Sequence, residues 1–121
     1  MKTEQLLKLY PSRANQSPDS YKTSIMSIRK EAEPASAEET AFLALRQLEL
    51  AELCYRTSPD NETKAFISGL LDELTQSTSF PEIHKRISYL RGLMDAGDAA
   101  REGHNAGLPR RILTTIGKIL A

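Results

Sequence analysis

The side chains that could act as nucleophiles or metal ligands are few and scattered. The sequence holds one cysteine, Cys54, and two histidines, His84 and His104. Cys54 lies on the apolar side of a predicted helix, where burial keeps a thiol protonated and unreactive. A zinc site needs three or four ligands, and Glu102 and His104 supply only two. We therefore expect no metal, no cofactor and no catalytic residue.

Acidic residues occur in pairs, but their positions are typical of solvent-facing helix surfaces. Asp72 and Glu73 are adjacent on one predicted helix, and no pattern places two carboxylates around a cleft, as general acid–base catalysis requires. The glycines form no phosphate-binding loop, and no serine stands in a Gly-x-Ser-x-Gly turn. These observations predict a protein that is not an enzyme.

The charges sum to zero but are unevenly distributed. Residues 1–30 carry six basic and two acidic side chains, residues 31–82 carry three and eleven, and residues 83–121 carry seven and three. Two interpretations follow from this basic–acidic–basic pattern. Either the basic ends fold back along the acidic middle, which we favour, or a basic end and an acidic face are presented to different partners.

The spacing of apolar residues predicts an all-α fold. Ser36 with Glu39, and Ser79 with Glu82, are capping boxes ahead of apolar helical patterns. The chain contains no valine and no alternating pattern of the kind that a strand shows. We predict a small helical bundle with additional short N- and C-terminal helices. Its three main helices are expected over about 36–56, 61–76 and 79–96.

The first 35 residues show a weaker pattern. A short amphipathic segment covers 3–10, and residues 11–24 are polar and rich in turn-forming side chains. One or two helical turns are predicted within 25–33. We therefore interpret 1–35 as a polar segment with a short helix that serves as a linker or wrapping arm. The helical bundle domain is predicted to occupy 36–121.

Three features of the sequence bear on the cellular compartment of the protein. No apolar run approaches the roughly 20 residues that a membrane-spanning helix needs. The apolar stretch near the N-terminus is short and is interrupted by Lys8, so we expect no secretory signal. With one cysteine an intramolecular disulfide is impossible. We expect a cytoplasmic protein.

The predicted helix over 36–56 is apolar around most of its circumference. Such a helix either lies at the centre of a bundle or forms an interface. Phe42 and Leu53 fall on its otherwise charged side, which residues 1–30 could also cover. We predict a non-catalytic protein–protein interaction module, an adaptor, inhibitor or regulatory protein, with self-association into a homo-oligomer as a secondary hypothesis. The predicted partner interface comprises Phe42, Arg46, Glu49, Leu53 and Arg56.

Basic residues in the C-terminal third support an alternative, a DNA-binding or other nucleic-acid-binding regulator. Arginines bind phosphates with an affinity that falls with salt. However, the connection between 79–96 and a predicted last helix from Pro109 is longer than a helix–turn–helix needs, and aromatic residues are dispersed. Residues 109–120 are basic and amphipathic, so they could close the bundle, dock into a partner or lie on an anionic membrane. The predicted nucleic-acid contacts are Lys85, Arg86, Arg91, Arg110, Arg111 and Lys118.

Overall fold

The computed structural model describes the backbone of residues 1–106 and the side chains of residues 1–97. Over this range the chain forms five helices and no strand, so the predicted all-α bundle is confirmed. None of the helices in the range has the length and apolar character of a membrane-spanning segment. The helices are α1 (Thr3–Leu9), α2 (Pro18–Glu31), α3 (Ala37–Thr57), α4 (Asn61–Ser77) and α5 (Pro81–Ala106).

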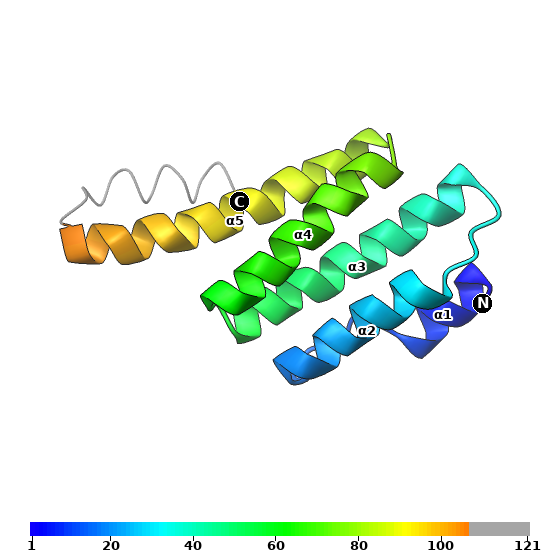
Figure 1. Cartoon of the computed structure of the whole chain (residues 1–121), viewed down its shortest axis with the longest axis horizontal. Helices are drawn as coiled ribbons and strands as arrows, with labels where there is room; N and C mark the ends of the chain where they lie inside the picture. Colours follow the sequence, from blue (N-terminus) through cyan, green and yellow to red (C-terminus); the bar gives the residue numbers. More distant parts are fainter. Residues whose placement is uncertain (107–121) are drawn as a thin grey trace.

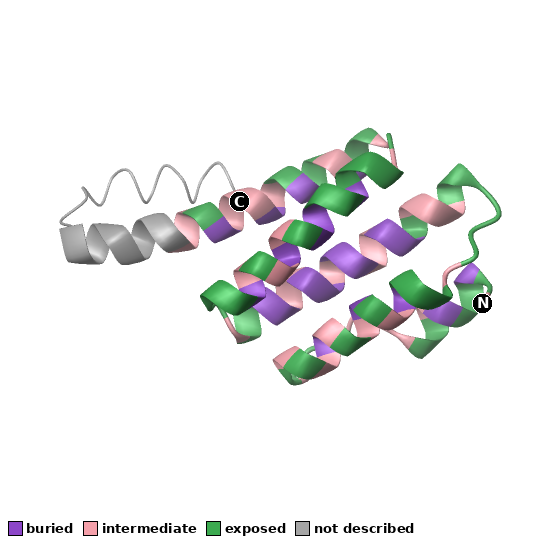
Figure 2. Ribbon diagram, in the orientation of Figure 1, coloured by how far each residue is buried: buried purple, intermediate pink, exposed green. Residues whose placement is uncertain are grey.

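The long helix α3 is the centre of the bundle. It packs against each of the other four helices, with α1 and α2 on one side and α4 and α5 on the other (Figure 1). Buried positions run along its length (Figure 2), and Leu48, Leu50 and Ala51 are buried on different sides of it. The unusually wide apolar arc is therefore explained by burial on several sides.

Side-chain caps fix the starts of three helices. The Ser36 hydroxyl accepts a hydrogen bond of 3.1 Å from the Glu39 amide ahead of α3, as the capping box predicts. Asp60 accepts a 2.8 Å bond from the Thr63 amide ahead of α4. Ser17 caps α2 in the same way. These caps satisfy amides that would otherwise lack partners at the first turn.

The predicted cap at Ser79 is wrong. Helix α5 begins at Pro81, and the Phe80 carbonyl accepts the first bonds, from the amides of Ile83 and His84. Phe80 is half-buried against the core, so packing of its ring sets where the helix begins. The helix also continues past its expected end at residue 96. The predicted helix from Pro109 lies outside the described residues.

Helix α2 corrects the prediction of a polar linker through residue 24. Ser17 and Pro18 supply a cap and a first-turn proline, which together start a helix. Tyr21, Ile25 and Ile28 then follow at helical spacing, and all three side chains are fully buried. Serine, threonine and lysine residues on the exposed side hide this stripe in the sequence. Residues 1–35 therefore contribute to the core that α3, α4 and α5 share.

The connection between α1 and α2 is an ordered loop. The Tyr21 hydroxyl donates a 2.7 Å hydrogen bond to the Arg13 carbonyl and accepts one from the Gln16 amide. Asn15 lies in the left-handed region with φ of 65°, a conformation that asparagine tolerates better than most residues. Of the two expectations for this segment, the wrapping loop agrees with these contacts.

Ion pairs join the basic N- and C-terminal parts of the chain to its acidic middle. Arg29 on α2 pairs with Glu73 on α4, and the Arg91 guanidinium on α5 donates to Asp72 at 2.7 Å. Both pairs connect residues far apart in sequence. The favoured interpretation, charge complementarity within the fold, is confirmed for these two pairs.

Candidate functional site

The predicted partner interface on α3 is partly covered by α1. Arg46 lies in the middle of this face, and its guanidinium donates to the carbonyls of Leu7 and Tyr10 at 2.7 and 2.9 Å. These carbonyls belong to the last turn and the end of α1, where backbone acceptors lack helical partners. Arg46 therefore attaches α1 to α3, and only 21% of its side chain remains exposed.

Three further members of the predicted interface also have contacts within the chain. Glu49 accepts a long 3.5 Å bond from the Ser12 hydroxyl and lies 3.5 Å from Arg46. Leu53 is half-buried against the core. Arg56 donates to the Tyr89 hydroxyl of α5 at 3.1 Å. Glu49 and Leu53 are thus partly covered by the rest of the chain, whereas Arg56 stays exposed.

Phe42 and Arg56 are the exposed members of the predicted interface, and Phe42 is the apolar one of the two, with 56% of its surface exposed. It lies beside a groove of about 500 Å³ formed by α1, the α2–α3 connection and the first turns of α3. We call this the Phe42 groove. Its lining residues are Lys2, Thr3, Glu4, Leu7, Glu33, Ala35, Glu39 and Phe42.

The Phe42 groove combines an apolar surface with an acidic rim. Phe42, Leu7 and Ala35 supply the apolar side chains, and three carboxylates outnumber the single lysine among the lining residues. Glu4 pairs at 3.4 Å with Lys8, one turn later on α1, and this pair is exposed and therefore weak. Glu33 lies 3.1 Å from the α-amino group of Met1. Two of the three carboxylates are thus already paired within the chain, so the groove offers a ligand mainly its apolar side chains, with Glu39 beside them.

Sequence reasoning found Phe42 and missed the rest of the groove. Glu4 and Leu7 come from a segment predicted as a short helix, but nothing in their spacing indicates that this helix packs beside residue 42. Glu33 and Ala35 lie in the connection after α2, which ends at Glu31, inside the 25–33 segment where one or two helical turns were predicted. The one usable signal was Phe42 itself, a large aromatic side chain among charged neighbours on a helix.

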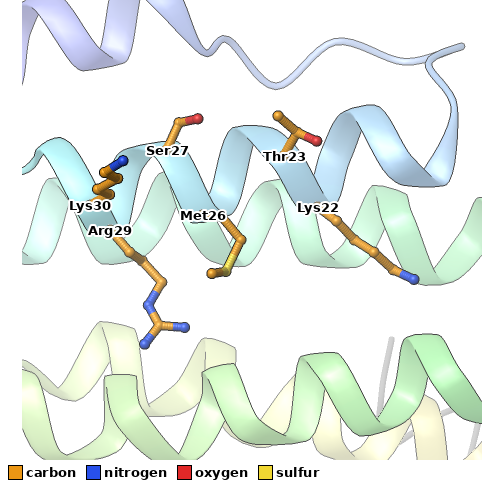
Figure 3. A pocket seen from close by; sticks show the side chains of 6 residues that line it. All are labelled: Lys22, Thr23, Met26, Ser27, Arg29 and Lys30. Carbon is orange, nitrogen blue, oxygen red and sulfur yellow. The ribbon is translucent and has the colours of Figure 1, made fainter.

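A second hollow, of about 590 Å³, lies along the exposed side of α2. Figure 3 shows Lys22, Met26 and Arg29 extending from α2 toward α4. Lys22 already lies over the Phe66 ring at 5.9 Å, and Arg29 pairs with Glu73. These contacts with α4 engage two of the three cations that line this surface, so it is a weaker candidate than the Phe42 groove.

The structure describes only half of the basic residues predicted to contact nucleic acid. Lys85 and Arg86 are exposed on α5, whereas Arg91 is engaged with Asp72. The other predicted contacts, Arg110, Arg111 and Lys118, lie outside the described residues. The described residues therefore do not assemble a continuous basic surface from this set, and the nucleic-acid alternative stays a prediction.

The side chains with chemical reactivity are held in structural contacts. Burial raises the pKa of the Cys54 thiol, and its sulfur lies 3.6 Å from the Pro18 carbonyl. The His84 ring lies 2.7 Å from the Thr78 carbonyl, at the connection between α4 and α5. Within the described part of the chain, no group of three His, Cys, Asp or Glu residues could hold a metal ion.

Comparison with known proteins leaves the function to be argued from this chain alone. No family model, no curated protein and no solved structure matches it.

Proposed function

We propose that the chain is a non-catalytic protein–protein interaction module that binds a partner through the Phe42 groove. The observation that carries this proposal is the exposure of Phe42 beside a groove that already contains Leu7 and Ala35. Full burial of a phenylalanine side chain is worth about 1.5–3 kcal/mol, and a partner could supply roughly half of that by covering the 56% of Phe42 that is exposed. Aromatic side chains in such positions are typical anchors of protein interfaces.

The position of Phe42 on α3 also favours recognition. The two residues that follow it, Leu43 and Ala44, are buried, so the backbone that carries Phe42 is fixed in the core. An anchor on a rigid helix loses little conformational freedom when a partner binds.

The chemistry of the groove indicates the kind of partner. Apolar residues with acidic neighbours complement an amphipathic helix that carries apolar side chains next to lysine or arginine. Such a helix would place one apolar side chain against Phe42 and direct its basic residues to Glu4 and Glu39. Rim charges of this kind mainly raise the association rate and exclude acidic competitors.

Site-specific photo-crosslinking in the native host tests the proposal. A photoreactive phenylalanine analogue replaces Phe42 in one sample and Met26 in a control, because Met26 is 51% exposed and belongs to the α2 surface. We expect a defined protein adduct from position 42 and not from position 26. Phe42→Ser should then weaken binding of the purified partner by at least about tenfold without unfolding the chain. Equal adducts from both positions, or none from position 42, would contradict the proposal.

A further inference from the structure

Residues 107–121 combine basic and apolar side chains, the combination that we propose for a ligand of the Phe42 groove. The segment carries Arg110, Arg111 and Lys118 and contains no Asp or Glu. Ile112, Ile116 and other apolar residues recur at helical spacing, as in an amphipathic helix. The segment is therefore both basic and apolar, whereas the lining of the Phe42 groove is apolar with an excess of carboxylates.

The direction of α5 determines which groove this segment can reach. Helix α5 has 26 residues, which span about 39 Å. It leads the chain away from the N-terminus, where α1 and the Phe42 groove lie (Figure 1). As the helix that its spacing predicts, a segment of 15 residues is only about 22 Å long. The groove of a second copy is thus more accessible to it than the groove of its own chain.

We propose that residues 107–121 of one copy dock in the Phe42 groove of a second copy. Ile112 and Ile116 would pack against Phe42, and Arg110 and Arg111 would face Glu4 and Glu39. Reciprocal docking of the two segments closes a two-fold dimer, since each copy offers one segment and one groove. This inference rests on the proposed function, because it uses the same groove and names its occupant.

Charge also determines where the segment does not bind. The exposed side of α2 presents Lys22, Arg29 and Lys30 around Met26. A segment with three basic residues and no acidic one is repelled by that surface and attracted by the rim of the Phe42 groove. Of these two hollows, the Phe42 groove is the one with acidic residues in its lining.

A charge-swap experiment on the full chain tests the inference. Light scattering and sedimentation measure the mass over a range of concentrations, and we expect it to approach twice 13.5 kDa. Arg110→Glu with Arg111→Glu, or Glu4→Lys with Glu39→Lys, should each weaken association by at least about tenfold. The two pairs combined should restore it. Circular dichroism checks that each variant keeps its helices.

Glu38→Lys is the matched control, because Glu38 lies in the same first turn of α3 but does not line the groove. It carries the same change of charge as Glu39→Lys, near the same helix N-terminus, and should leave association unchanged. A wild-type chain that stays monomeric, a combined variant that does not recover, or an equal effect of Glu38→Lys would overturn the inference. A crosslink from position 42 to a different protein would still support the proposed function in that case.

Discussion

The close approach of Gly97 to Tyr55 predicts how a side chain at residue 97 would change the stability of the fold. Helix α5 passes so close to α3 that a Cβ on Gly97 would overlap the Tyr55 hydroxyl oxygen. The same Cβ would lie 3.5 Å from Cζ of the ring, which is an ordinary contact. Tyr55 is buried, so its ring cannot simply turn into solvent. The hydroxyl oxygen is therefore the atom that opposes a side chain at residue 97.

Two opposing effects determine the stability of Gly97→Ala. Alanine in a helix interior is favoured over glycine by about 1 kcal/mol. Overpacking against a buried group costs about 1–3 kcal/mol. We expect Gly97→Ala to range from neutral to about 2 kcal/mol destabilising in the wild-type chain. In a Tyr55→Phe background the overlap disappears, and the same substitution should stabilise by about 1 kcal/mol.

The assay is urea unfolding followed by circular dichroism for the four chains of the double-mutant cycle. The expected coupling between the two sites is about 1–3 kcal/mol, the overpacking cost itself. Gly69→Ala is the reference for helix propensity, because Gly69 is exposed on α4 and nothing lies within 4 Å of its added Cβ. A coupling near zero, with Gly97→Ala as stabilising as Gly69→Ala, would refute the reasoning.

Three further predictions concern α1, pH and nucleic acid. Arg46→Met removes the two bonds to α1 and should cost about 2 kcal/mol, with faster amide exchange in Thr3–Leu9 than in α4. The Ser58 hydroxyl and backbone amide of Thr63 lower the pKa of Asp60 from 3.8 to about 2, so its contribution to stability is present above pH 4 and is lost as pH falls toward 2. Urea midpoints measured from pH 6 to pH 2 should therefore decrease more steeply for the wild type than for Asp60→Asn. For nucleic acid, labelled duplex titrated at several salt concentrations should show no saturable site; a salt slope that shrinks in Arg110→Ala with Arg111→Ala would instead establish the alternative.

The helices that could be predicted are those whose apolar stripes and caps lie together in the sequence. Ser36 precedes a long run of strong helix formers, and α3 begins one residue later. Helix α2 carries the same kinds of signal in Ser17, Pro18 and a stripe from Tyr21 to Ile28, but its exposed residues are turn-forming types. The turn-forming residues argue against a helix there, whereas the spacing of the apolar residues predicts one. The helix forms because its apolar side is buried against α3, and tertiary packing often outweighs intrinsic propensity.

The candidate site could be predicted only in part, because its parts are distant in sequence. Phe42 could be predicted as an interface residue because it is aromatic and has charged neighbours on its helix face, and it is exposed. Arg46 lies on the same face of the predicted helix as Phe42, and the sequence gives equal reason to expect it at the surface. Its partners are backbone carbonyls of α1. Every residue has a backbone carbonyl, so residue types do not indicate which carbonyls accept a hydrogen bond from a side chain. No pattern within one helix could therefore have separated these two residues.

The hydrogen bonds from Arg46 to α1 cover part of the Arg46 side chain and also position one wall of the Phe42 groove. Arg46 holds the Leu7 carbonyl at 2.7 Å, and the Leu7 side chain lines the groove beside Phe42. Loss of this contact frees α1, and with it Glu4 and the apolar wall opposite Phe42. Arg46 is therefore a positioning residue for the proposed site, although no ligand need touch it. Arg46→Met should weaken ligand binding while Phe42 stays exposed and intact, whereas Arg56→Met, on the same face but joined to α5, should leave it unchanged.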